Sequence, residues 1–159
     1  MQDKHPNAAL IERFYDAFAR HDGEAMVACY HPNVEFSDDV FGELTSAEAG
    51  GMWRMFCETG TDLRVEATDV LADDRSGSAK WNAWYTFSAT GRSVHNVILA
   101  RFEFADGLIR RHKDSFSFPK WAAQALGMPG KLFGRTPFLR KAVRGRAHKT
   151  LNEYLQSKV

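Results

Sequence analysis

Apolar residues recur at helical spacing through most of the first half of the chain. The stretch "NAALIERFYDAFARHD" places leucine, isoleucine and aromatic residues three or four positions apart, which predicts an amphipathic helix with Asn7 as a possible cap. "GEAMVACY" predicts a short second helix that ends at "HPN", and "VEFSDDVFGEL" predicts a strand that runs into a turn. "TSAEAGGMWRMFCETG" predicts a helix capped by Thr45 or Ser46, with Glu48 placed for a capping box.

Residues 62–118 change to the two-residue alternation of strands. Four runs, "DLRVEATDVLAD", "SAKWNAWYTFSAT", "SVHNVILARFEFAD" and "LIRRHKDSFSF", are separated by the turn signals "DDRSGS", "TGR" and "ADG". Because these connections are too short for helical crossovers, the runs predict an antiparallel meander. In the third run the face expected to pack on the helices carries Asn96, Ile98, Ala100, Phe102 and Phe104. The opposite, outer face of that run carries His95, Val97, Leu99, Arg101 and Glu103.

The last forty residues return to helical spacing. "FPKWAAQALG" predicts a short helix closed by Gly127, "MPGKLFGR" a loop, and the remainder a final helix with Thr136 at the cap and Pro137 in the first turn. Helices followed by a long curled antiparallel sheet predict an α+β fold, in which the sheet wraps around the first helix as a cone. We expect one domain over residues 1–159, with a core at about 6–126 and a helical extension at about 127–159.

Composition agrees with a single domain. A chain of 159 residues with 44% hydrophobic residues is long enough to bury a sizeable core. No stretch approaches the ~20 consecutive apolar residues of a membrane span, and "MQDKHPNAAL" lacks the pattern of a secretory signal. We therefore expect a soluble cytoplasmic protein without integral membrane contact. Cys29 and Cys57 form no CxxC or Cys/His cluster, so reduced thiols are expected.

Charge is distributed unevenly along the chain. Residues 1–118 hold twelve Lys and Arg against nineteen Asp and Glu, whereas residues 119–159 hold nine against one, Glu153. The favoured interpretation is that the basic tail docks on the acidic body of its own or a partner subunit, because its cations alternate with apolar residues. The alternative interpretation is that the tail contacts nucleic acid or an anionic membrane. Because docking is favoured, we expect no nucleic-acid partner.

The last strand-like run, "LIRRHKDSFSF", places two ionisable residues on an apolar face. If it is a strand, His112 and Asp114 point the same way as Phe116 and Phe118. Buried polar groups require partners, so the pair is either a structural feature of the core or the working part of a pocket. A carboxylate in an apolar cone suits proton transfer near neutral pH, and a neutral imidazole beside it can orient or donate. Asn96 is expected on the neighbouring strand, facing the same way.

With these residues in place, the chain resembles the nuclear-transport-factor-2-like superfamily, which includes ketosteroid isomerase, limonene epoxide hydrolase, scytalone dehydratase and the SnoaL-like polyketide cyclases. The resemblance rests on "IERFYDAFARHD", "HPNVEFSDDVFGEL", "GRSVHNVILARFEFADGLIRRHKDSFSF" and "WAAQALGMPG", which together cover about residues 8–130. It implies a cone-shaped α+β fold and is closest to the SnoaL-like and isomerase-related branch. The resemblance also implies a homodimer formed through the outer face of the sheet.

The resemblance implies roles for individual carboxylates. Asp38 stands where the isomerase has its base, but the places of the two oxyanion donors hold Phe14 and Ala100, which cannot donate a hydrogen bond. The polyketide cyclases carry an acid/base aspartate on the last long strand, where Asp114 lies. Asp39 is expected at the rim, since adjacent residues cannot both point inward from a strand.

These observations lead to two hypotheses from different classes. The first is a cofactor-free isomerase, aldol-type cyclase or dehydratase that acts on a small hydrophobic carbonyl compound, with Asp114 as acid/base, His112 and Asn96 as its partners, and Asp38 as a second carboxylate across the cavity. The second is a non-catalytic ligand-binding or scaffold dimer. No metal or cofactor motif is present in the sequence. Aromatic residues expected to line or plug the cone are Trp53, Trp81, Trp84, Tyr85, Phe41 and Phe116.

Overall fold

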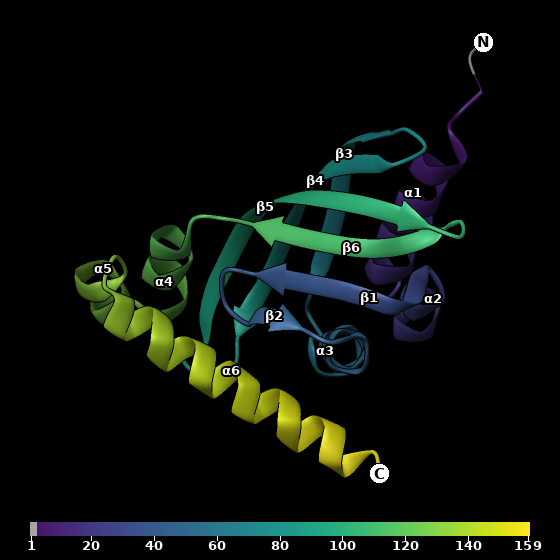
Figure 1. Cartoon of the computed structure of the whole chain (residues 1–159). Coiled ribbons are helices and arrows are strands. Elements are labelled where there is room, and N and C mark those ends of the chain that lie inside the picture. Colours follow the sequence, from purple (N-terminus) through teal and green to yellow (C-terminus); the bar gives the residue numbers. More distant parts are fainter. Residues whose placement is uncertain (1–2) are drawn as a thin grey trace.

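The computed structural model describes residues 3–159 as six helices and one sheet of six strands (Figure 1). The helices are α1 (Pro6–Ala19), α2 (Gly23–Ala28), α3 (Ser46–Thr59), α4 (Phe118–Leu126), α5 (Met128–Phe133) and α6 (Pro137–Ser157). The strands are β1 (Tyr30–Asp38), β2 (Gly42–Leu44), β3 (Arg64–Ala72), β4 (Ser76–Phe87), β5 (Arg92–Ala105) and β6 (Leu108–Ser115). The predicted α+β class is confirmed.

The strands are ordered β2-β1-β6-β5-β4-β3. The predicted meander from β3 to β6 is antiparallel throughout, but β1 and β6 run parallel, so the sheet is mixed and the expectation of a purely antiparallel sheet was wrong. The difference arises because no tight turn joins β1 to β6. After β2 the chain crosses through α3 to the far edge, and three hairpins return it beside β1.

The sheet is curved around α1 and α3 (Figure 1). Irregularities in strand register occur in β3, β5 and β1, and such bulges bend a strand and increase its twist. Helix α1 packs on β3 and β4, while α3 packs on β1. Aromatic residues of the two helices, among them Phe14, Phe18 and Trp53, therefore meet the inner faces of the strands in one core.

Several predicted helix ends are confirmed. Thr45 and Glu48 form the capping box of α3, Gly127 closes α4 with a φ of 71°, and the Thr136 side chain caps α6. At α1 the cap is His5 rather than Asn7, because Pro6 begins the helix and the Asn7 side chain donates to the carbonyl of Asp73 instead.

Two segments differ from the sequence predictions. The second helix does not extend to "HPN", since α2 ends at Ala28 and β1 begins at Tyr30, and the His31 ring bonds to Asp106 on the neighbouring hairpin. "MPGKLFGR" is not a loop, since residues 128–133 form α5 directly against α4. The close contact requires Gly130, where a Cβ atom would lie 1.9 Å from the carbonyl oxygen of Ala122.

Helix α6 crosses the lower side of the molecule and packs on α3 (Figure 1). Leu151 is its buried anchor, and Gly51 of α3 leaves room for Leu155. Arg140 pairs with Asp39 at 3.7 Å and Lys158 with Glu58 at 3.2 Å, so part of the basic tail docks on the acidic body of its own chain. Among the described residues, no helix combines the length and apolar character that crossing a membrane requires.

Candidate functional site

His112 and Asp114 lie together on the inner face of β6, as their alternation predicts. Their side chains are 0% and 3% exposed, and His112 Nε2 lies 2.8 Å from Asp114 Oδ1. The neighbouring strand β5 presents Phe102 opposite His112 and Ala100 opposite Asp114. Neither of these neighbours offers a polar side chain, so the partners of the pair come from other elements.

Tyr30, the first residue of β1, completes the hydrogen bonding of His112. Its hydroxyl lies 2.7 Å from His112 Nδ1 and accepts a hydrogen bond of 2.8 Å from Trp53 Nε1. Because an indole N–H only donates, the hydroxyl proton of Tyr30 is available for Nδ1, and His112 then carries its proton on Nε2 and donates it to Asp114. The result is a buried chain from Trp53 through Tyr30 and His112 to Asp114.

The two oxygens of Asp114 have different surroundings. Oδ1 accepts hydrogen bonds from His112 and, at 3.3 Å, from Trp81 Nε1, whereas Oδ2 forms none with residues 3–159. Nearby, Tyr15 of α1 carries a buried hydroxyl that has no hydrogen-bond partner in the described part of the chain. Burial raises the pKa of Tyr15, and the negative charge of Asp114 contributes to the same shift. The core therefore holds one free carboxylate oxygen and one unpaired phenol.

Asp38 lies beside Asp114 rather than across the cavity from it. Parallel pairing of β1 with β6 matches Phe36 with His112 and Ser37 with Lys113, which brings Asp38 next to Asp114 on the inner face. This corrects the expected placement on opposite walls, because the parallel pair was not foreseen. Burial raises the pKa of Asp38 to about 7, and the charge of Asp114 adds to the effect.

Backbone N–H groups oppose this pKa shift and hold the Asp38 carboxylate in place. Oδ1 accepts from Val40 N at 2.9 Å and from Phe41 N at 2.6 Å in the turn after β1. Two side chains of α6 hold the same turn from the other side, since Arg144 Nε donates to the Val40 carbonyl at 3.1 Å and His148 Nε2 lies 2.6 Å from the Phe41 carbonyl oxygen. Helix α6 is thus connected to Asp38 through two backbone groups.

Asp39 points away from this carboxylate pair, as expected. Its Oδ2 accepts a hydrogen bond of 2.9 Å from the backbone N–H of Phe116, and its Oδ1 faces Arg140. Asp39 therefore joins β1 to the end of β6 and to α6, which is a structural role.

Three other candidate residues, Tyr85, Asn96 and Phe116, are half-buried and belong to the end of the sheet that α4 covers. Tyr85 accepts a hydrogen bond of 2.8 Å from Trp121 Nε1, and its pKa is raised by burial and by the Asp38 charge. Asn96 shares the inner face, but it lies four residues beyond Ala100, the partner of Asp114 on β5. At about 3.3 Å per residue this separates Asn96 from Asp114 by roughly 13 Å, and no hydrogen bond between the two is found in residues 3–159.

Aromatic side chains fill the deep part of the cone. Trp53 stacks on the His112 ring with centroids 5.9 Å apart, and the Phe102 ring centroid lies 4.5 Å from the same ring. The Phe41 ring is buried against Phe56 and the His148 ring. Asp38, Tyr85, Asn96 and Phe116 are less buried than these aromatic residues, and we call these four residues the rim.

Trp84 does not line the cone. It faces outward on β4, where it stacks on His95 at 4.7 Å between ring centroids and lies under the guanidinium of Arg64. The expected inner position was wrong because Trp81 occupies the inner face and residues alternate along the strand. His95 is on the outer face, as predicted.

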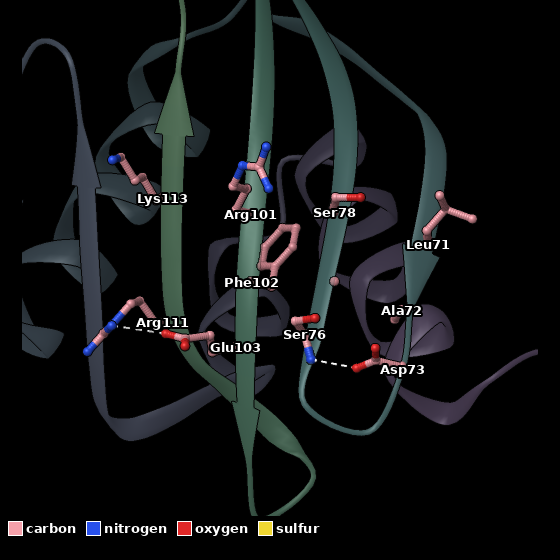
Figure 2. Close-up of a pocket in the computed structure, with 11 residues that line it drawn as sticks. Leu71, Ala72, Asp73, Ser76, Ser78, Arg101, Phe102, Glu103, Arg111 and Lys113 are labelled. Atoms are coloured by element: carbon pink, nitrogen blue, oxygen red, sulfur yellow. Dashed lines mark hydrogen bonds and ion pairs between the residues drawn. The ribbon is translucent and has the colours of Figure 1, made fainter.

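Two surface hollows lie elsewhere. Figure 2 shows one of about 590 Å³ on the outer face of β3 to β6, where Arg111 pairs with Glu103 and where Arg101 and Lys113 are neighbours. A second hollow of about 470 Å³ is lined by residues of α1 and β3. Neither includes Asp38 or Asp114. Among residues 3–159, no group of three His, Cys, Asp or Glu side chains is arranged to hold a metal ion.

Sequence reasoning missed Tyr30 and Tyr15. Tyr30 was placed at the end of a helix, where nothing suggested a partner on a strand eighty residues later. Tyr15 was assigned to the aromatic face of α1, and a helical pattern does not show whether a hydroxyl finds a partner. The only available signal was composition, because buried tyrosines usually require a hydrogen bond.

Comparison with known structures supports the same fold. A SnoaL-like protein from Jannaschia sp. CCS1 is 12% identical with a TM-score of 0.67, and the match covers 81% of this chain and 99% of that one. An LEH-like epoxide hydrolase from M. tuberculosis is 16% identical with a TM-score of 0.61, covering 80% and 93%. TerC, co-crystallised with polyporic acid, is 20% identical with a TM-score of 0.57, covering 70% and 92%. These identities establish the shared fold alone.

No curated protein matches the sequence. Residues 11–112 match the SnoaL-like domain, a segment that runs from α1 to His112 and ends two residues before Asp114. Helices α4 to α6 lie outside the matched segment. Because the match covers well over half of the chain, the protein belongs to the SnoaL-like domain family, with the nuclear-transport-factor-2-like fold.

Proposed function

We propose that the protein is a cofactor-independent acid/base enzyme acting on a small hydrophobic carbonyl compound, as an isomerase, aldol-type cyclase or dehydratase. The observation that carries the proposal is the adjacent pair of inward carboxylates, Asp38 and Asp114. A general base works best when its pKa lies near the operating pH, and the pKa of Asp38 is raised to about 7. Such a base exchanges protons readily near neutrality.

The two carboxylates would have separate roles. Asp38 would remove a proton from the carbon beside the carbonyl, because its N–H contacts with Val40 and Phe41 orient the carboxylate. Asp114 would act as acid/base through Oδ2, since Oδ1 is held by His112 and Trp81. His112 and Tyr30 would position Asp114 without touching the substrate. Asn96, Tyr85 and Phe116 would contact the substrate near the rim.

Hydrogen–deuterium exchange tests the proposal without a known product. The protein is incubated in D₂O with hydrophobic ketones that carry a hydrogen on the carbon beside the carbonyl, and these ketones are first selected by thermal shift. Mass spectrometry then measures deuterium uptake at carbon. We expect uptake whose rate rises with pH through about 7, as Asp38 loses its proton.

Matched variants identify the responsible groups. Asp38→Asn and Asp114→Asn should each lower the exchange rate by about 10² or more, the usual contribution of a general base. Asp39→Asn is the control, because it changes the adjacent carboxylate, which points away from the pair, and it should leave the rate within about threefold. Unchanged exchange in Asp38→Asn, or selected compounds that bind and never exchange, would refute the enzymatic proposal.

The alternative is a non-catalytic binding or scaffold dimer, and exposed apolar side chains on the outer sheet face favour a dimer. Leu71, Val97 and Leu99 are all exposed there. We propose that this face pairs two copies, because apolar residues are enriched at the core of homodimer interfaces. Sedimentation should show a dimer that Leu99→Lys converts to a monomer. A wild-type monomer at all concentrations would contradict the dimer.

A further inference from the structure

Large apolar side chains are exposed where α5 meets α6. Met128, Leu132, Phe133 and Phe138 are 62%, 66%, 51% and 80% exposed. We call residues 128–138 the elbow; α5 and the start of α6 lie at one end of the molecule, far from α1 (Figure 1). Scattered exposed apolar residues are common on soluble proteins, but four within eleven residues form a cluster that requires an explanation.

The cations of residues 128–159 divide into two groups. Arg140, Arg144 and Lys158 contact the body of the protein through Asp39, the Val40 carbonyl and Glu58. The second group forms no side-chain hydrogen bond or ion pair within residues 3–159, and it consists of Lys131, Arg135, Lys141, Arg146 and Lys149. Docking on the acidic body therefore accounts for the first group and leaves the second without a function.

Helical spacing places the unpaired cations on the same side as the exposed apolar residues. In α6, Phe138, Lys141, Gly145 and Lys149 follow one another at intervals of three or four residues and are all exposed. The opposite face packs on the rest of the protein through Leu139, Val143, Ala147, Leu151 and Leu155. The segment has one acidic residue, Glu153, which lies in the last part of α6 far from the elbow.

We propose that the elbow and the outer face of α6 bind the surface of an anionic lipid membrane. Apolar side chains inserted at the headgroup boundary, surrounded by lysine and arginine, are the features by which helices lie on such membranes. The exposed aromatic and aliphatic residues supply the insertion, and the five unpaired cations supply attraction to anionic headgroups. Since α6 also holds the turn of Asp38, the same contact would place the candidate site close to membrane-dissolved hydrophobic molecules.

Vesicle flotation with the full chain tests the proposal. We expect binding to vesicles of equal parts phosphatidylcholine and phosphatidylglycerol, weak binding to pure phosphatidylcholine, and release by high salt. Lys141→Ala combined with Lys149→Ala should lower the partition coefficient roughly thirtyfold at low salt, because each cation near an anionic surface contributes about fivefold. Leu132→Ser combined with Phe138→Ser should abolish retention, and both side chains are exposed enough to leave folding unchanged.

The control removes equal charge from a distant surface. Arg13→Ala combined with Arg20→Ala changes one exposed cation of α1 and one at its C-cap, and this variant should bind vesicles like the wild type. Three results would each overturn the proposal: no binding to anionic vesicles, equal loss of binding in the α1 control, or an elbow that instead pairs two copies. In the last case the wild type would sediment as a dimer and Phe138→Ser as a monomer. Neither the wild type nor this variant would then bind vesicles. Failure of the exchange assay would leave this proposal intact, since the two readouts are independent.

Discussion

At the scale of single residues, the inner site shows how an aromatic core accommodates polar side chains. Tyr30, His112 and Asp114 are buried together and each has a hydrogen-bond partner. The Tyr15 hydroxyl is equally buried and has no partner among residues 3–159. An unpaired buried hydroxyl costs about 1–3 kcal/mol, whereas a satisfied one contributes roughly 1 kcal/mol. The Tyr30 hydroxyl therefore stabilises the core, whereas the Tyr15 hydroxyl destabilises it.

Removing the hydroxyl should have opposite effects at these two positions. Tyr30→Phe leaves Trp53 Nε1 and His112 Nδ1 without partners, so we expect a loss of about 2–4 kcal/mol in the free energy of unfolding. Tyr15→Phe removes an unpaired group and should be neutral or stabilising by up to about 1 kcal/mol. Urea denaturation measures both. Equal destabilisation by the two variants would contradict the hydrogen bonds of Tyr30 with Trp53 and His112.

Asp38 should make folding stability depend on pH. Its pKa is about 7 in the folded protein against 3.8 as the reference value, so the protonated form is favoured by folding. The stabilising contribution of protonated Asp38 to folding is fully present below about pH 3.8 and is lost as pH rises through about 7. Linkage sets an upper limit of about 4 kcal/mol, and partial screening by solvent at this incompletely buried carboxylate roughly halves it to about 2 kcal/mol.

The variant Asp38→Asn isolates this contribution, because an amide oxygen can still accept from Val40 and Phe41 but does not titrate. Between pH 4.5 and 8 the wild type should lose about 2 kcal/mol relative to Asp38→Asn, measured by urea denaturation at each pH. Parallel stability curves for the two proteins would contradict the raised pKa.

Strand alternation predicted the inward positions of His112 and Asp114, because period two leaves a residue only one of two faces. It could not show that Tyr30 bonds to His112, since that contact joins residues 82 positions apart across the parallel pair of strands. It also could not measure distance along a strand. Asn96 shares the correct face and still lies too far along β5 to contact Asp114.

At the scale of elements, local sequence predicted the ends of helices more reliably than it predicted short helices. Thr45 with Glu48, Gly127 and Thr136 mark their helix ends through side-chain or backbone preferences that depend on a few neighbouring residues. Helix α5 has six residues, and the sequence pattern predicts a loop at this position. Short helices are marginal by themselves, and tertiary contact with α4 stabilises this one.

Two glycines in neighbouring helices should respond differently to alanine. Gly130→Ala places Cβ against the Ala122 carbonyl oxygen, so we expect a loss of about 3 kcal/mol from forced separation of α4 and α5. At Gly145 in α6 a Cβ would meet nothing within 4 Å, and Gly145→Ala should stabilise by about 0.5–1 kcal/mol through helix propensity. Thermal unfolding by circular dichroism distinguishes the two, and a neutral Gly130→Ala would contradict the close contact.

At the scale of the whole molecule, α6 belongs to the folded unit although it lies outside the matched family segment. Its inner face packs on α3, and Arg144 and His148 hold the turn of Asp38. A tail that was foreseen as a basic extension is therefore also a support for the candidate site.

Loss of the α6 anchor should weaken the entire fold. Leu151→Ala creates a cavity against α3 and should cost about 3 kcal/mol, with far-ultraviolet and near-ultraviolet circular dichroism reporting one common transition. Leu132→Ala, which changes an exposed leucine of α5, should stay within about 0.5 kcal/mol of the wild type. Separate transitions for helix and aromatic signals in Leu151→Ala would mean that α6 unfolds independently.

The sequence by itself determined the α+β class, the main helices and strands, and the inner face that carries His112 and Asp114, because these depend on periodicity and on caps a few residues apart. The tertiary structure decided the parallel contact of β1 with β6, the adjacency of Asp38 and Asp114, the Tyr30 partner and the division of the basic tail into bound and free cations. Each of these joins residues far apart in the chain. Such pairings depend on how whole elements pack, and local sequence patterns carry no record of that packing.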